Sequence, residues 1–126
     1  MGRVLGIHHS SVLVEDTKRS LDFYVNILGF KVNQSRPSME FFGAWLVAGD
    51  LEIHLLELPN PDAGSVRPDH AGRDRHTAMK VANINGFIER FEREGIAYTR
   101  SRSGRSALFC RDPDGNGIEL VEVAEQ

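Results

Sequence analysis

The sequence predicts an α+β domain built from two tandem βαβββ modules. Two observations support this fold class. Strand-like and helix-like apolar patterns follow one another in the same order in both halves of the chain. The halves also align with a nearly constant offset, since His76 and Phe91 lie 67 positions after His9 and Tyr24. A repeat of this kind indicates a duplicated structural unit.

The first module is predicted over about residues 4–58. It opens with a strand over Val4–Val14, and Asp16 or Thr17 can then cap a helix that runs to about Leu28. Gly29 is placed to end that helix. Three strands complete the module, over Phe30–Val32, Glu40–Ala48 and Leu51–Leu58, the last two joined by a Gly49-Asp50 turn.

The second module is predicted over about residues 76–123, after a loop over 59–75 that is rich in Pro, Gly, Asp and Arg. A loop of this length in a compact domain is usually functional or disordered. The module has a strand over His76–Val81, a helix capped by Asn83 or Asn85, and Gly95 as its end. Three strands follow, over Ile96–Arg100, Ser106–Arg111 and Ile118–Val123.

The composition is that of one soluble domain of 126 residues, with 40% hydrophobic and 26% charged residues. The net charge of -3 and the absence of a basic block make nucleic acid an unexpected partner. No apolar run is long enough to span a membrane, and the N-terminus does not have the pattern of a signal peptide. A single cysteine, Cys110, fits a reducing compartment, so we expect a cytoplasmic protein.

Polar side chains occupy two equivalent strand positions in each half. His9 aligns with His76, and His54 aligns with Glu119, which follows the Asp112–Gly117 turn. Three imidazoles and one carboxylate are borderline ligands, which suit Zn, Ni, Co, Fe(II) or Mn(II) better than Ca or Mg. We therefore predict one divalent metal held by His9, His54, His76 and Glu119.

Each predicted ligand also has an ordinary structural interpretation. A lone strand glutamate is usually solvated, His54 could point outward, and His76 could be a loop-edge residue. His8 and His9 are neighbours on a strand, where side chains alternate between faces, so only one of them can face the site. The repeat favours His9. His70 has no repeat partner, so we expect it not to bind the metal.

These segments resemble the vicinal oxygen chelate superfamily, which includes glyoxalase I, bleomycin resistance proteins and extradiol dioxygenases. The resemblance covers nearly the whole chain. It rests on the segments His9–Asp16, Ser20–Tyr24, Leu28–Phe30, His76–Val81 and Asp112–Leu120. Glyoxalase I-like proteins are the most similar branch. The resemblance implies a glyoxalase-like fold in which paired modules curl around a metal, often in a homodimer whose subunits share the site.

The resemblance also implies an activity. Glyoxalase I isomerises the hemithioacetal of methylglyoxal and glutathione through a metal-stabilised enediolate, so this chain would be a lactoylglutathione lyase-like metalloenzyme. Glu119 would then be both ligand and catalytic base. Two positions depart from the family pattern. Typical glyoxalase I has glutamate where this chain has His54. Bacterial enzymes have a glutathione-binding asparagine where this chain has Leu58, with Asn60 two residues further on.

Two arginines are candidates for binding a substrate carboxylate, Arg73 in the long loop and Arg105 before the penultimate strand. Other functions stay open at this point. A dioxygenase with Fe(II) or Mn(II) would use His9, His76 and Glu119 as a two-His, one-carboxylate triad and would leave His54 without a role. A drug-sequestering protein without catalysis would not need the ligand set.

Overall fold

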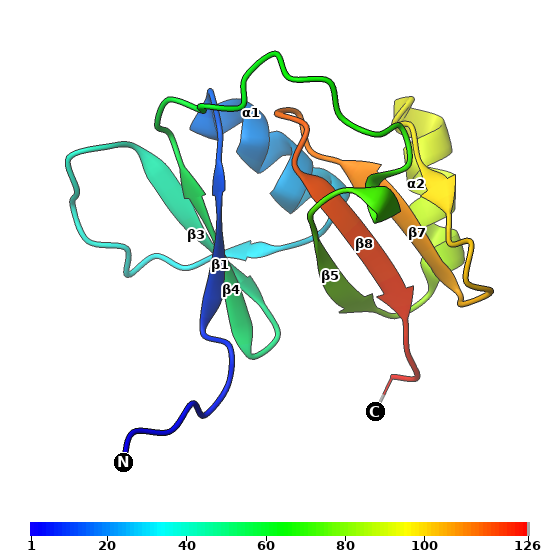
Figure 1. Cartoon of the computed structure of the whole chain (residues 1–126), viewed down its shortest axis with the longest axis horizontal. Helices are drawn as coiled ribbons and strands as arrows, with labels where there is room; N and C mark the ends of the chain where they lie inside the picture. Colours follow the sequence, from blue (N-terminus) through cyan, green and yellow to red (C-terminus); the bar gives the residue numbers. More distant parts are fainter. Residues whose placement is uncertain (126) are drawn as a thin grey trace.

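The computed structural model describes residues 1–125 and contains two four-stranded sheets, each with a helix (Figure 1). The first sheet has the strand order β1-β4-β3-β2 and the second β5-β8-β7-β6. The strands are β1 (His9–Leu13), β2 (Lys31–Val32), β3 (Gly43–Ala48), β4 (Leu51–Leu56), β5 (His76–Val81), β6 (Thr99–Arg100), β7 (Ala107–Arg111) and β8 (Gly117–Glu122). Both sheets are mixed, because β1 and β5 run parallel to their partners β4 and β8 while the other pairs are antiparallel. The α+β fold of two βαβββ modules is therefore confirmed.

The N-terminal strand is shorter than predicted. β1 begins at His9, whereas the apolar pattern had suggested Val4. The first pair in the β1–β4 register is His9 with Glu52, and the partner strand turns back at Gly49-Asp50 just before β4 begins. Residues 4–8 have no strand to pair with, and they extend away from the sheet (Figure 1). Alternation alone cannot reveal a missing partner.

The helix of the first module has an unusual continuation. α1 (Thr17–Leu21) begins after Asp16, whose carboxylate accepts the backbone N–H groups of Lys18 and Arg19 at 3.0 and 3.3 Å. From Asp22 to Ile27 the chain continues as the π-helix η1, up to the C-cap at Leu28. Gly29, at φ +85°, then reverses the chain as predicted.

The second module repeats this plan with one α-helix, α2 (Ile84–Glu94). Asn83 is its N-cap, and Gly95 ends it in the left-handed conformation. A short 3-10 helix, η2 (Ala71–Arg73), closes the loop that precedes β5. None of the helices in residues 1–125 is long and apolar enough to cross a membrane.

The register of the two sheets shows the duplication directly. Ser11 pairs with His54 across β1 and β4, and Ala78 pairs with Glu119 across β5 and β8. Ser11 and Ala78, which are 67 positions apart in the sequence, thus occupy the same place in their sheets. The same holds for His54 and Glu119, which are 65 positions apart. The aligned pair His54 and Glu119 is equivalent in three dimensions as well.

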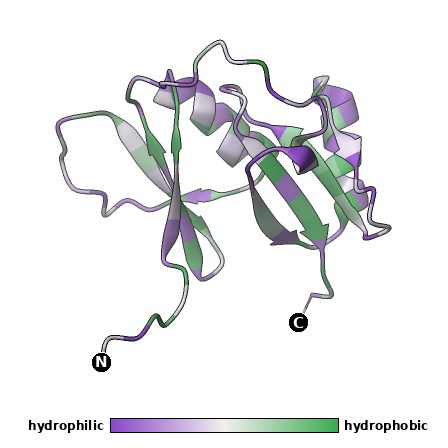
Figure 2. Ribbon diagram, viewed as in Figure 1, coloured by the Kyte–Doolittle hydropathy of each residue, from purple (hydrophilic) through white to green (hydrophobic). Residues whose placement is uncertain are grey.

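One hydrophobic core joins the modules. Figure 2 shows hydrophobic colour along the strands and hydrophilic colour on much of α2. The buried side chains of both sheets and of the helices form a single cluster, which comprises Val14, Phe23, Tyr24, Leu28, Ala44, Leu46, Ile53, Leu55, Ile84, Phe91, Leu108, Cys110, Ile118 and Leu120. Burial raises the pKa of the Cys110 thiol to about 12, so this cysteine is an unreactive core residue.

A buried polar contact also links the modules. The Tyr24 hydroxyl in η1 donates to the Asp112 carboxylate at 2.8 Å, and the side chain of Asn116 donates to the same oxygen at 2.8 Å. The other oxygen accepts the backbone N–H groups of Asp114 and Asn116. Burial raises the pKa of the Asp112 carboxyl, and these donors oppose the rise. The turn before β8 is thereby held against the first module.

We expect Asp112→Ala to lower the free energy of unfolding by about 3 kcal/mol, because it leaves several buried donors without an acceptor. Chemical denaturation followed by circular dichroism measures this change. Asp114→Asn is the matched control in the same turn. It breaks an ion pair with the partly exposed Arg19, so its cost should stay below about 1 kcal/mol. Equal costs for the two variants would contradict the linking role of Asp112.

Candidate metal and acid–base site

The predicted ligands form two pairs, one on each sheet. On the first sheet, the rings of His9 and His54 are stacked with centroids 4.0 Å apart. His54 is buried, whereas His9 is exposed on the edge strand β1. Desolvation by the neighbouring side chains, followed by the nearby charges of His54 and His8, lowers the pKa of His9. A lower pKa favours the neutral imidazole, the form that binds metals.

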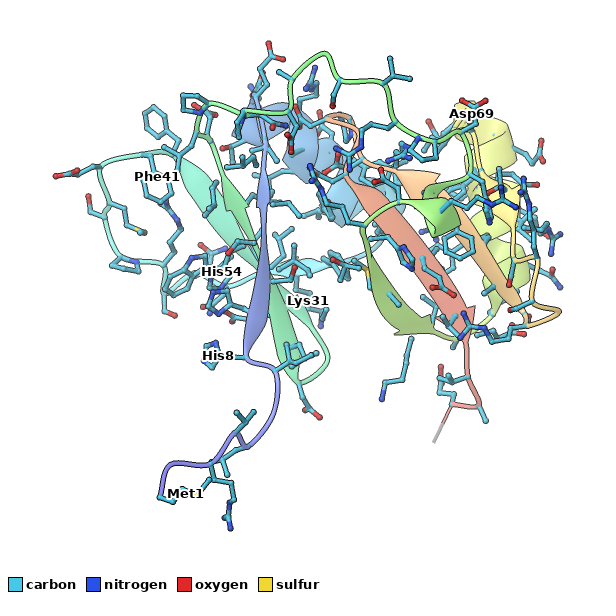
Figure 3. All side chains as sticks on the ribbon, viewed as in Figure 1. Met1, His8, Lys31, Phe41, His54 and Asp69 are labelled. Carbon is cyan, nitrogen blue, oxygen red and sulfur yellow. The ribbon has the colours of Figure 1, made fainter. Side chains whose placement is uncertain are left out.

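His54 is held from two sides. The Trp45 indole, its cross-strand neighbour, stacks on it at 4.6 Å between centroids. The Nε2–H group of His54 donates to the Glu52 carboxylate at 2.9 Å, and this bond holds the pKa of Glu52 below its ordinary value. Figure 3 labels His54 on this first sheet, with His8 nearby at the start of β1. His8 is exposed, and its Nδ1 atom lies 2.9 Å from that of His9.

The second pair is His76 and Glu119. The Nδ1–H group of His76 donates to the backbone carbonyl of Asp74 at 2.8 Å. In the neutral ring, Nε2 therefore carries the lone pair, and it lies 3.2 Å from Oε1 of Glu119. Two acceptor atoms at this separation are stable together only with a proton or a cation between them. Glu119 itself is only 3% exposed.

Phe109 is the aromatic residue that packs beside this second pair. It lies opposite Glu119 in the β7–β8 register, the position that Trp45 has opposite His54 in the first sheet. Its ring meets the edge of His76 at 5.3 Å between centroids. His70 also contacts the Phe109 ring, at 4.8 Å between centroids, and bonds Thr99 at 2.6 Å, so it is a packing residue in the structure.

The two predicted substrate arginines differ in their positions. The guanidinium of Arg105 reaches from the exposed segment before β7 and donates to Oε2 of Glu119 at 2.7 Å. Its side chain is 58% exposed, whereas that of Glu119 is 4% exposed. Arg73 lies in η2, is exposed, and makes no ion pair within residues 1–125. Of the two, only Arg105 reaches the predicted ligands.

The long loop is anchored beside this pair. Asp74 accepts hydrogen bonds from Arg67 at 2.6 Å and from Arg111 at 3.0 Å. The bond from Arg67 holds the pKa of Asp74 well below its ordinary value. These contacts fix the backbone whose carbonyl orients His76.

A polar cleft of about 440 Å³ lies at the seam of the two modules. Its lining includes Ser10–Leu13 of β1, Asn60 and Asp62–Ser65 of the long loop, and His76 and Thr77. The Ser10 and Thr77 hydroxyls lie 3.5 Å apart across the seam. The cleft thus gives a small polar molecule access to one predicted ligand, His76.

The donor set suits a borderline divalent ion such as Zn, Ni, Co, Fe(II) or Mn(II). Ligand bonds of about 2.0–2.2 Å place neighbouring donor atoms about 3 Å apart, which agrees with the 3.2 Å between His76 and Glu119. The residues present therefore fit a metal. However, residues 1–125 of one chain contain no group of three or more His, Cys, Asp or Glu side chains placed to hold one. Within one chain, the predicted donors therefore lie as two separate pairs.

Comparison with known proteins agrees with the two-module fold. The family model for the Glyoxalase/Bleomycin resistance protein/Dioxygenase superfamily matches residues 6–120. The chain belongs to this superfamily. It is 31% identical to "Glyoxylase I 4" of Arabidopsis thaliana over 90% of this chain and 68% of that protein. It is 30% identical to "Lactoylglutathione lyase" of Salmonella typhimurium over 93% of this chain and 92% of that protein.

A solved structure with the superfamily fold is that of the fosfomycin resistance protein FosX of Listeria monocytogenes, complexed with Mn(II). It superposes with a TM-score of 0.76 over 97% of this chain and 95% of that chain, at 17% identity. At this identity the likeness shows the fold alone. Members of the superfamily commonly bind a divalent metal, as FosX binds Mn(II).

Sequence reasoning did not identify Trp45, Glu52 and Phe109 as site residues. The repeat could have found the two aromatics, because Trp45 and Phe109 precede His54 and Glu119 by nine and ten positions. Glu52 has no such signal. A glutamate two residues before a histidine on a strand shares its face, but the hydrogen bond between them depends on their rotamers.

Proposed function

We propose that the protein is a metal-dependent lyase or isomerase of the glyoxalase I type. It acts on a small oxo substrate or on the hemithioacetal that such a substrate forms with a thiol. The observation that carries this proposal is the equivalent register of His54 and Glu119, each beside a histidine of an edge strand and opposite an aromatic residue of the next strand. A drug-binding protein without catalysis has no need for this duplicated donor set.

Glu119 has the properties of the base. Its carboxylate is buried, sits on a strand, and has one oxygen directed at His76 and the other at Arg105. In the proposed reaction it takes a proton from the carbon beside a carbonyl and returns a proton to the neighbouring carbon. The proton moves between two carbons of the same substrate, so the reaction needs no external oxidant or reductant. A bound divalent ion supplies Lewis-acid polarisation of the substrate oxygens.

The four-ligand set is completed between two chains in this proposal. One chain offers His9 with His54, and the other offers His76 with Glu119. A homodimer with two such shared sites would satisfy all eight donors, and each site would present Arg105 to an anionic group of the substrate. Glutathione is one thiol with suitable carboxylates. Leu58 replaces the family asparagine, so the thiol must be found by assay.

The testing experiment uses Trp45, the single tryptophan of the chain. Because its indole stacks on His54, we expect Ni²⁺ or Co²⁺ bound at His54 to quench its fluorescence with a stoichiometry of one metal per site. The same samples are then assayed with methylglyoxal, with and without glutathione. His54→Gln is the matched variant and should lose the metal-dependent quenching.

Two results would contradict the proposal. The first is that neither fluorescence nor elemental analysis detects binding of Ni, Co, Zn, Fe(II) or Mn(II). That result would exclude a metal-dependent enzyme. Metal binding with oxygen consumption on catechol-type substrates, and no activity on oxo substrates, would instead indicate a ring-cleaving dioxygenase.

A further inference from the structure

His54 differs from the other predicted histidine ligands because one of its nitrogens already bonds a carboxylate that is not itself a predicted ligand. Its Nε2 atom lies 2.9 Å from Oε1 of Glu52, which precedes it by two residues on β4 and shares its face of the sheet. A carboxylate only accepts hydrogen bonds, so Nε2 must carry the proton. In the neutral ring the lone pair is therefore on Nδ1.

Glu52 is itself locked in place. Its second oxygen, Oε2, accepts the side-chain amide of Asn33 at 2.7 Å. Asn33 is anchored in turn, because its backbone N–H donates to the carbonyl of Trp45 at 2.8 Å. Each oxygen of the carboxylate thus has its own donor, one from β4 itself and one from the residue that follows β2.

The stacked rings prevent His54 from turning away from this partner. Trp45 covers one face of the imidazole and His9 covers the other, at 4.6 and 4.0 Å between centroids. Intermediate rotations of the ring about its χ2 angle would lose both contacts, and a 180° flip, which keeps them, would lose the hydrogen bond from Nε2 to Glu52. Asn33 thus holds Glu52 by one hydrogen bond, and Glu52 holds His54 by another. The orientation of the His54 ring therefore depends on both residues.

We propose that Glu52 is the positioning residue that makes His54 a metal ligand through Nδ1. This inference rests on the proposed function, in which His54 binds the metal. A carboxylate hydrogen-bonded to the far nitrogen of an imidazole fixes its tautomer and increases its basicity as a ligand. Glu52 also places a negative charge next to His54, which as a metal ligand is itself neutral.

The test measures metal affinity, by calorimetry and by Trp45 fluorescence with Ni²⁺ and Co²⁺, and needs no turnover. Removal of a partner of this kind lowers metal affinity about 10- to 100-fold, so we expect that loss for Glu52→Gln. Asp50→Asn is the matched control. It removes the same charge from the turn beside β4, where the side chain is exposed, and should leave the affinity unchanged.

Two further variants separate positioning from general charge and from structural damage. Asn33→Ala keeps the carboxylate but removes its support, so it should weaken metal binding in the same direction and by less. In a His54→Gln background, Glu52→Gln should change the remaining affinity by less than about twofold, because no ring is left to orient. Circular dichroism and thermal unfolding of the metal-free variants confirm that each is folded.

The outcomes distinguish this inference from the function it rests on. If the wild type binds metal and Glu52→Gln binds it as tightly as Asp50→Asn does, the positioning role is wrong and the metalloenzyme stands. An equally large loss in the His54→Gln background would also overturn it, because Glu52 would then act without His54. If the wild type binds no divalent metal, both proposals fail.

Discussion

Glu119→Gln is expected to lower turnover roughly a thousandfold while leaving the fold intact. General acid–base catalysis contributes about 10²- to 10⁴-fold in rate, and a glutamine of the same shape cannot take the substrate proton. The variant should also bind the metal more weakly, since an amide is a poorer ligand than a carboxylate. Steady-state kinetics at saturating metal, with circular dichroism of the same sample, measures both effects.

Glu122→Gln is the control for this variant. Glu122 lies on the same strand, but its carboxylate accepts the backbone N–H of Ile84 at the start of α2 and the hydroxyl of Ser106. Its replacement should lower stability slightly and leave turnover unchanged. If Glu119→Gln retained more than about a tenth of wild-type turnover, the base would have to be another residue.

Mixing two inactive variants is expected to restore activity. His54→Gln removes a predicted ligand from the pair on the first sheet, and Glu119→Gln removes one from the pair on the second. If each site combines pairs from two chains, a mixed dimer has one site with both pairs intact and one with both changed. With random exchange of subunits, about a quarter of all sites would then be intact.

This mixing experiment is measured after co-refolding or co-expression, with the two variants carrying different affinity tags. The unmixed variants, treated in the same way, are the controls. Activity that stays at their level in a purified mixed dimer would mean that the site lies within one chain. A chain that stays monomeric in the presence of metal would contradict the shared site directly.

The internal repeat explains why much of the fold could be predicted. Local periodicity revealed β5 at its observed bounds, and glycines at positions 29 and 95 marked the helix ends. The offset between the halves then linked residues that lie far apart in the sequence, so His9, His54, His76 and Glu119 were proposed as one set. The β1–β4 and β5–β8 registers confirm that the halves correspond.

Two features of the first module could not be predicted in this way. Val4–His8 has the composition of a strand but lacks a partner strand, and the π-helix that begins at Asp22 carries Tyr24, whose hydroxyl bonds Asp112 of the second module. Both depend on contacts between distant segments. A pattern read along one segment contains no information about such contacts.

The sequence by itself determined the two-module plan and the identity of the metal-capable side chains. These follow from periodicity and ligand chemistry, which are local properties. Only the tertiary structure decided that the ligands form two pairs, that Arg105 reaches Glu119, and that Glu52 holds His54. The physical reason is that a hydrogen bond needs two atoms within about 3 Å, and such distances are set by strand pairing, loop path and rotamer together.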